Sequence, residues 1–162
     1  MHIRHTTQED LPAILEIYAI ARRFMAANGN ATQWGTVKPA AERVAQDIEE
    51  GISYVGTDDE GVIRFVFVFF TDPEPTYAFI ENGAWLHDAP YGTIHRVATD
   101  GTIHGAMGLI TAFCRERIGN LRIDTHVNNI PMQKALAKNG FVHCGTIYLE
   151  NGDSRIAFQT KD

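Results

Sequence analysis

Apolar residues recur at helical spacing near the start of the chain. The first of them fall on one face of a helix: Leu11, Ile14, Leu15 and Tyr18. Pro12 stands where proline is favoured, in a first helical turn, and Asn28-Gly29-Asn30 is typical of a helix end. A second helix is expected to begin at Pro39 and to end at Gly51, and residues 2–6 are expected to form a short strand before both helices.

The middle of the chain changes to the pattern of β-strands. Residues 52–56 and 62–70 are predicted strands, because a turn signal rich in acidic residues and glycine separates them. The run over 62–70 is so apolar that both faces of this strand must be covered. Residues 77–80 and 84–86 are expected to add a further strand, and residues 93–99 to form the next.

The last part of the chain alternates between helix and strand patterns. The predicted order is a helix over 105–118, a strand over 121–125, a helix over 129–138 and strands over 141–148 and 154–159. A strand–helix–strand unit among antiparallel neighbours predicts an α/β (α+β) fold with a mixed, mostly antiparallel central sheet of six to seven strands. We expect one parallel pair, helices on both faces and a single domain over residues 1–162.

Composition narrows the class of protein. The chain has 162 residues, of which 44% are hydrophobic and 21% charged, as in an ordinary globular domain. Its net charge is −6, and no basic cluster exceeds the pair Arg22-Arg23, so no nucleic-acid partner is expected. The apolar run over 65–70 is far shorter than a membrane span, and the first residues lack an apolar signal region. We therefore expect a cytoplasmic protein without a membrane partner, in which Cys114 and Cys144 stay reduced.

The segment between the strand over 93–99 and the helix over 105–118 is rich in small residues. The first N–H groups of a helix lack partners and carry partial positive charge, so this corner can hold a phosphate or pyrophosphate. Gly105 and Gly108 would let a ligand approach the backbone, although close packing of the helix explains them equally well. No Gly-Lys-Ser/Thr follows, which excludes a P-loop, and the dinucleotide fingerprint is matched only in part.

Histidine spacing gives no support for a metal site. His2 and His5 lie three apart on a predicted strand, so they face opposite ways. The histidines further along show no ligand spacing with cysteines or carboxylates: His87, His95, His104 and His143. No metal is therefore expected.

Two motifs at a short, fixed separation carry a resemblance to a known family. Val97, Thr99, Thr102, Gly105 and Met107 align with a pyrophosphate loop of the form Val-x-Pro-x-x-(Arg/Gln)-x-x-Gly-x-(Gly/Ala). A later motif, Asn-x-x-Ala…(Leu-Tyr)-x-Lys-x-Gly-Phe, aligns with Asn129, Met132, Ala135-Leu136, Lys138, Gly140 and Phe141. On these residues the sequence resembles the GNAT-type N-acetyltransferase superfamily, in a poorly characterised bacterial branch, over nearly the whole chain.

The resemblance implies a GNAT-like sheet whose parallel pair splays apart and binds acetyl-CoA, the acetyl donor. Its pantetheine would pair with strand backbone, and its pyrophosphate would lie at the helix start. The implied cofactor-binding residues are Arg96, Val97, Ala98, Thr99, Thr102, His104, Gly105, Ala106, Met107, Gly108, Asn129 and Met132. A backbone N–H near Arg96 or Val97 would stabilise the oxyanion.

Three positions depart from the family pattern. Thr102 replaces the usual Arg or Gln of the pyrophosphate loop, and Met107 replaces its second Gly or Ala. Leu136 stands where many members carry the tyrosine that protonates the leaving thiolate. The last change leaves open an alternative function, a non-catalytic acyl-CoA-binding module or sensor with the same fold.

The activity that the resemblance implies is transfer of an acetyl group from acetyl-CoA to a primary amine, by direct attack in a ternary complex. An alkylamine with a pKa of ~10.4 is protonated at neutral pH, so a base must take its proton. The candidates, in order, are His126, then His95, then Tyr91 acting through water.

The acceptor, a small-molecule or peptide amine, is expected opposite the cofactor. Trp34, Glu81 and Trp85 are the candidate substrate-binding residues, because aromatic rings and a carboxylate hold an ammonium group. Core packing is the alternative, and for Phe24 and Tyr77 it is the better interpretation. Either a monomer or a homodimer is compatible with the sequence.

Overall fold

The computed structural model describes residues 1–161, which divide into two compact units. The first contains Met1–Phe69 and His95–Ala106, and the second contains Phe70–Ile94 and the chain from Met107 onward. The sheet has the strand order β1-β2-β3-β4-β5-β7-β6. The division between the units falls within β4, after Ile94, and before the last residue of β3.

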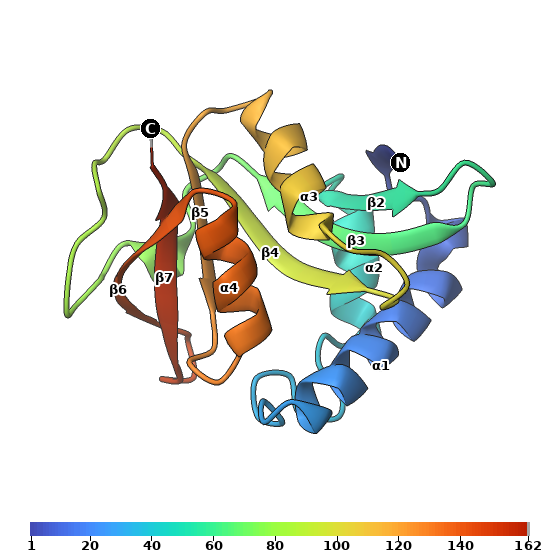
Figure 1. Ribbon diagram of the computed structural model, residues 1–162, viewed down its shortest axis with the longest axis horizontal. Coiled ribbons are helices and arrows are strands. Elements are labelled where there is room, and N and C mark those ends of the chain that lie inside the picture. Colours follow the sequence, from blue (N-terminus) through green and yellow to red (C-terminus); the bar gives the residue numbers. More distant parts are fainter. Residues whose placement is uncertain (162) are drawn as a thin grey trace. The chain divides into compact units, whose positions relative to one another are not determined.

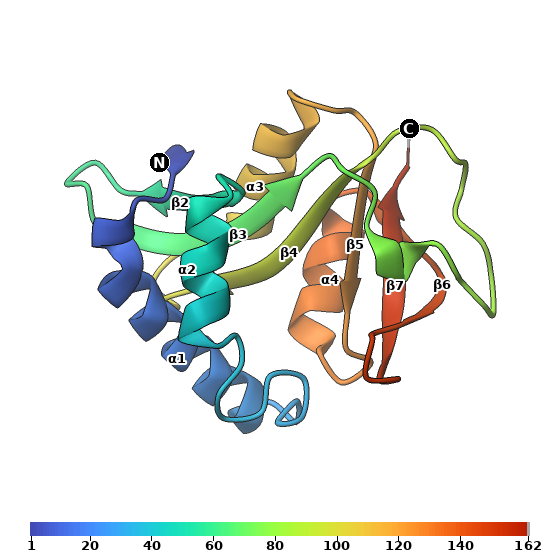
Figure 2. The ribbon, with the colours of Figure 1, turned by 180° about the vertical axis from the view of Figure 1, so that it is seen from behind.

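The first unit places two helices against antiparallel strands. Its elements are β1 (His2–His5), α1 (Leu11–Ala27), α2 (Ala41–Glu49), β2 (Ser53–Thr57), β3 (Ile63–Phe70) and the second half of β4 (Gly92–Thr99). Figure 2 shows α2 lying across β3, with α1 running beside α2. The periodic apolar residues of both helices meet the sheet in one core: Ile14, Ile17, Tyr18, Val44, Ile48, Val55, Val66 and Ala98. The helical spacing of apolar residues in α1 therefore corresponds to one face of the helix that is buried in this core.

The β2–β3 hairpin supplies the most apolar part of this unit. Phe65 to Val68 have no solvent-exposed surface, which confirms that both faces of β3 are covered. Gly56 of β2 lies opposite Phe65 in the antiparallel register, and the register shifts between Gly56 and Thr57. The glycine leaves room for the Phe65 ring, which occupies the place where a larger side chain would stand.

The second unit contains the parallel pair and two further helices. Its elements are the first half of β4, α3 (Ala106–Arg115), β5 (Leu121–Thr125), α4 (Ile130–Lys138), β6 (Phe141–Tyr148) and β7 (Ser154–Thr160). Gly92–Ile94 pair in parallel with Leu121–Ile123, and β7 runs antiparallel to both β5 and β6. Figure 1 and Figure 2 both show α4 running beside β5. Beyond Ile123, β5 continues to Thr125 with β7 as its partner.

Over residues 1–161 the predicted fold class is confirmed, with seven strands, one parallel pair and four α-helices. One predicted element is wrong: residues 77–80 and 84–86 form no strand. Instead, Pro75–Tyr77 form a short 3-10 helix, and Glu81 makes a single antiparallel bridge to Thr146. The reason lies in Gly83, whose φ of 153° and close approach to the Cys144 carbonyl turn the chain away from a strand.

Helix boundaries differ from the predictions by a few residues. The second helix begins at Ala41 rather than at Pro39, and the helix predicted over 105–118 covers Ala106–Arg115. Turn-like hydrogen bonds from the N–H groups of Arg117 and Ile118 to the Cys114 carbonyl continue past its end. Such differences are expected, because helix ends fray and shorten into tighter turns.

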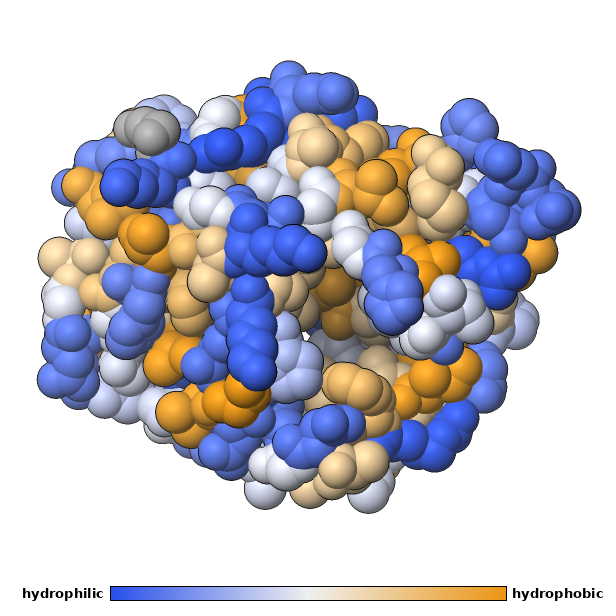
Figure 3. All heavy atoms as spheres, in the orientation of Figure 1, coloured by the Kyte–Doolittle hydropathy of each residue, from blue (hydrophilic) through white to orange (hydrophobic). Residues whose placement is uncertain are grey.

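Apolar and polar side chains are interleaved on the face seen in Figure 3. The large hydrophobic residues with the highest exposure are Val37, Phe79, Val127 and Phe24. Scattered exposure of this kind is normal for a folded domain. Within residues 1–161, no helix combines the length and the apolar character that crossing a bilayer requires.

Candidate functional site

Strand β4 contains an unusual residue at its centre. Arg96 has a φ of 48°, in the left-handed region that residues with a side chain rarely adopt. Residues 95–97 are all half-buried, so the alternation of a regular strand is interrupted here. Such a conformation costs about 1–3 kcal/mol and persists only where surrounding contacts determine it.

Two helices of the first unit provide those contacts. The Tyr18 hydroxyl of α1 donates to the Arg96 carbonyl oxygen at 2.8 Å. The Asp47 carboxylate of α2 accepts from Arg96 Nε and Nη2, each at 2.8 Å, in a two-point ion pair. Both the main chain and the side chain of Arg96 are therefore held.

Asp47 is a buried charge. Its side chain is only 2% exposed, and it also accepts from Arg43 Nε at 3.1 Å, with Arg43 Nη2 2.9 Å away in the same ion pair. A buried carboxylate is tolerated only when it is paired in this way. Burial raises the pKa of Tyr18 above its usual range, so its hydroxyl keeps its proton for the Arg96 carbonyl.

Trp34 packs against the same group of residues. Its ring meets the Tyr18 ring edge-on, with the ring centroids 5.5 Å apart, and it is partly buried against the core of the first unit. The loop tryptophan therefore has a packing role, which its polar sequence neighbours did not suggest. Phe24, for which core packing was preferred, is instead 54% exposed.

The loop that follows β4 is organised by Asp100. Its carboxylate accepts from the Thr102 hydroxyl at 2.6 Å and the Thr102 N–H at 2.9 Å, and it pairs with Arg64 Nη1 at 3.1 Å. Arg64 also pairs with Asp58 of the β2–β3 turn at 2.8 Å. Burial alone would raise the pKa of Asp100, but the Thr102 and Arg64 contacts outweigh it and lower that pKa. The Thr102 side chain thus fixes the loop.

The residues before and within the first turn of α3 divide into exposed and buried groups. Thr102, His104 and Gly105 are exposed, whereas Ala106 and Met107 are buried. Gly105 has a φ of 77°, and a Cβ at this position would meet no atom within 4 Å. A Cβ on Gly108 would lie 3.2 Å from Asn139 Oδ1, so this glycine allows α3 to approach the end of α4.

In the second unit, His126 follows β5. Its Nδ1 accepts the Asn128 N–H at 3.0 Å, so the neutral ring carries its proton on Nε2. Burial lowers the pKa of His126, and the nearby charge of Arg155 lowers it further. Asn129 caps α4, since its Oδ1 accepts the Met132 N–H at 3.2 Å. Leu136 is completely buried, so a tyrosine would not fit there without repacking.

Two aromatic residues of the second unit contact a buried arginine. The Arg122 guanidinium lies 4.1 Å from the ring centroids of both Trp85 and Tyr91, and Nη2 donates to the His87 carbonyl at 2.8 Å. Arg122 is 4% exposed, and burial lowers its pKa. The Trp85 ring therefore contacts a cation that belongs to the protein itself.

Other candidate residues of this unit have structural partners. The Trp85 indole N–H donates to the Tyr77 carbonyl at 2.9 Å, and the buried Tyr77 hydroxyl donates to Asp124 at 2.7 Å. Glu81 accepts a hydrogen bond from the Tyr148 hydroxyl, in addition to its backbone bridge with Thr146. Core packing is thus confirmed for Tyr77.

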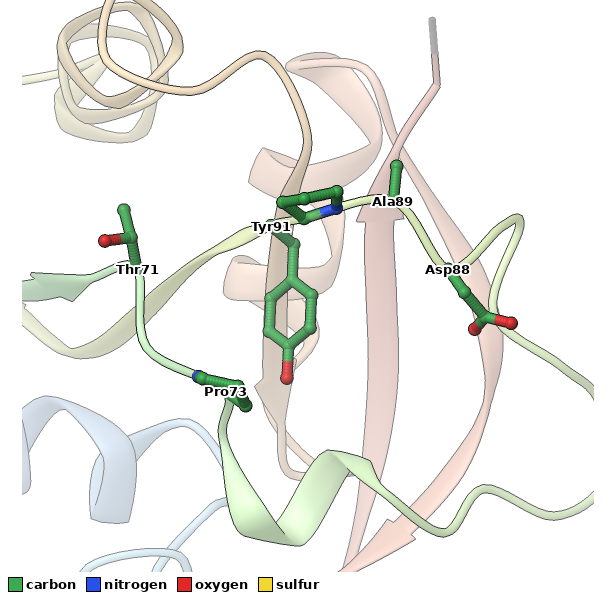
Figure 4. A pocket seen from close by; sticks show the side chains of 6 residues that line it. Thr71, Pro73, Asp88, Ala89 and Tyr91 are labelled. Carbon is green, nitrogen blue, oxygen red and sulfur yellow. The ribbon is translucent and has the colours of Figure 1, made fainter.

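A small pocket of about 260 Å³ lies beside Tyr91. Figure 4 shows Thr71 and Pro73 on one side of Tyr91, and Ala89 and Asp88 on the other. The Tyr91 hydroxyl oxygen accepts the Glu74 N–H at 2.9 Å. The volume of this pocket is below the usual ~300–1,000 Å³ of small-molecule sites.

The structure brings some candidates together. Trp34 and Arg96 both contact Tyr18, and Trp85 and Tyr91 both contact Arg122, whereas Glu81 lies against Tyr148. Sequence reasoning missed Tyr18, Asp47, Arg64 and Arg122. A signal existed for Asp47, because it lies three residues after Val44 on the apolar face of its helix. Among residues 1–161, no group of three or more His, Cys, Asp or Glu side chains is arranged to hold a metal ion.

Solved structures give a clear comparison. A crystal structure of a GNAT-family acetyltransferase from Streptococcus agalactiae superposes with a TM-score of 0.85 and 30% identity, covering 99% of this chain and 95% of that chain. A GNAT-family acetyltransferase from Listeria monocytogenes superposes with a TM-score of 0.69 and 19% identity, over 98% and 93% of the two chains. No protein-family model matches the sequence, and no curated protein matches it significantly.

A third structure has a ligand. It is a GNAT-superfamily phosphinothricin acetyltransferase from Sinorhizobium meliloti in complex with AcCoA, with a TM-score of 0.64 and 15% identity over 98% of this chain and 86% of that chain. Matches this distant support the fold alone. The Streptococcus agalactiae structure reaches further, since its identity extends over nearly the full length of both chains. On that agreement, this chain belongs to the GNAT family of acetyltransferases.

Proposed function

We propose that the chain, acting as one domain, transfers an acetyl group from acetyl-CoA to a primary amine of a small molecule or peptide. The observation that carries the proposal is the full-length match to a GNAT-family acetyltransferase at 30% identity. The acetyl-CoA complex of the Sinorhizobium meliloti enzyme, which has the same fold, adds support for the donor. Acetyl-CoA would supply the activated acetyl thioester.

The residues around β4 and its following loop fit this donor. Gly105 has open space where a side chain would stand, so a phosphate group can approach the main chain there. The first N–H groups of α3 are suited to an anion, because they lack partners within their own helix. The exposed His104 and Gly105 would hold the pyrophosphate, and the β4 main chain from Arg96 to Thr99 would bind the pantetheine. Asn129 and Met132 would contribute to donor binding at the start of α4.

Thermal unfolding tests the donor. At one hundred times its Kd, a ligand stabilises the folded state by about 2.7 kcal/mol, which raises the Tm of a domain of this size by about 5–10 °C. We expect this shift with acetyl-CoA and with CoA, and none with ATP or NAD. No shift with either CoA species at millimolar concentration would refute the proposal. Binding without transfer to any amine of a broad library would favour the acyl-CoA sensor instead.

For the base, we place His95 ahead of His126. Protonation of His126 on Nδ1 would break its bond to the Asn128 N–H, and its lowered pKa already keeps the ring neutral. His126 therefore suits the role of a neutral Nε2–H donor. Tyr91, whose hydroxyl oxygen already accepts the Glu74 N–H, is kept as the third candidate, acting through water.

Two substitutions separate the histidines. With an amine found in the library, we expect His95→Ala to lower kcat/KM by about 10²–10⁴-fold, the usual contribution of a general base. His126→Gln should cost less than about tenfold, because the amide can still accept the Asn128 N–H and donate. If both variants keep the wild-type kcat and pH profile, neither histidine is the base, and Tyr91→Phe becomes the next test.

A further inference from the structure

The left-handed residue of β4 is held from two sides by residues outside the strand. Arg96 has a φ of 48°, and no glycine or asparagine stands there to make this conformation inexpensive. Tyr18 binds its carbonyl oxygen, and Asp47 binds its guanidinium at two points. Strain of this kind is found where a backbone group has to be aimed.

The geometry has a consequence for the main chain. A residue in the left-handed region rotates the peptide that follows it away from the direction that a regular strand would give. The Val97 N–H therefore points where the alternation of β4 would not have placed it. Without the contacts to Tyr18 and Asp47, the extended conformation of Arg96 would be lower in free energy than the left-handed one.

We infer that Asp47 is a positioning residue, which holds Arg96 in the left-handed conformation and so aims the β4 N–H groups at the acetyl carbonyl. This role rests on the proposed function. Asp47 lies in α2 and acts only through Arg96. Its burial, at 2% side-chain exposure, keeps water from competing for the guanidinium. The charge of Arg43 on the same carboxylate oxygen compensates for that burial.

A stability cycle tests the positioning without any ligand. Asp47→Asn keeps the shape but weakens the two-point ion pair, and Arg96→Gly removes both the guanidinium and the conformational strain. We expect the Tm loss from Asp47→Asn to be at least halved when it is made in the Arg96→Gly background. Equal losses in the two backgrounds would overturn the positioning role. Glu42→Gln, in the exposed first turn of the same helix, is the matched control; it should lower Tm only by the small loss of its interaction with the helix start, and equally in both backgrounds.

The carbon-13 signal of the thioester carbonyl in [1-¹³C]acetyl-CoA tests whether the β4 N–H groups are aimed at that carbonyl. Donors aimed at that carbonyl shift its resonance downfield on binding. In Asp47→Asn we expect most of this shift to be lost while the Kd for acetyl-CoA changes less than threefold, a separation that general damage to the fold would not produce. If the carbonyl resonance of acetyl-CoA bound to Asp47→Asn shifts as far as it does in the wild-type complex, the inference is overturned.

A second variant covers the case in which Asp47→Asn does not fold. Tyr18→Phe removes only the hydrogen bond to the Arg96 carbonyl, and it should reduce the carbonyl shift in the same direction. A full wild-type shift in Tyr18→Phe would then overturn the inference. Failure of acetyl-CoA to bind the wild-type protein would refute the proposed function, whereas the stability cycle would still decide whether Asp47 holds Arg96.

Discussion

Gly56→Ala is expected to destabilise the protein by about 3 kcal/mol or more, which is at the upper end for overpacking. A Cβ on Gly56 would lie 2.1 Å from two carbon atoms of the Phe65 ring, well inside any van der Waals contact. The ring cannot move aside, because Phe65 has no exposed surface and its neighbours in β3 are equally buried. Urea denaturation followed by circular dichroism would measure the loss as a lower midpoint.

The cause can be isolated with a second substitution. Phe65→Leu removes the ring atoms that the new methyl group would strike, so the double variant Gly56→Ala/Phe65→Leu should be more stable than the sum of the single effects predicts. Gly119→Ala is the matched control, because its Cβ would meet nothing within 4 Å and its φ is ordinary. Losses that simply add would show that the Phe65 ring is not the obstacle.

The order of elements could be predicted because it depends on local patterns. The spacing of apolar residues in α1 and the continuous apolar run of β3 each reflect burial against a core that then formed as expected. The strand prediction for residues 77–80 and 84–86 was wrong because tertiary contacts determine the conformation of this segment. Its aromatic residues suggest a strand, but Tyr77 is buried with its hydroxyl on Asp124, and Gly83 fits tightly against the Cys144 carbonyl.

The candidate site was predicted less completely, because its residues are joined by contacts far apart in the sequence. Asp47 and Arg96 are separated by 49 positions, and no local pattern shows that one will hold the other. Thr102 is one of the implied cofactor-binding residues, and the sequence does not show that its hydroxyl donates to Asp100, two residues away. Trp85 was a candidate for binding the ammonium group of the acceptor, and the cation that it contacts is Arg122, which Tyr91 also contacts.

Arg122 shows what a buried cation contributes when its partners are rings. The guanidinium lies between Trp85 and Tyr91 and is 4% exposed, and its Nε is buried without a hydrogen-bond partner among the described residues. Contacts of this kind contribute up to about 2 kcal/mol each when water is excluded. The opposing term is desolvation of the charge, which also lowers the pKa of Arg122.

Substitutions at Arg122 should therefore separate packing from charge. We expect Arg122→Ala to lower the free energy of unfolding by about 3 kcal/mol, because it leaves a cavity between two large rings. Arg122→Met should lose no more than about 1.5 kcal/mol, since it fills the space between the rings and removes the buried charge. Arg122→Lys should fall between them, because an ammonium group is more strongly hydrated and cannot stack flat. Urea denaturation of the three variants measures the order, and a loss in Arg122→Met as large as that in Arg122→Ala would show that the cation itself, and not its volume, holds the rings together.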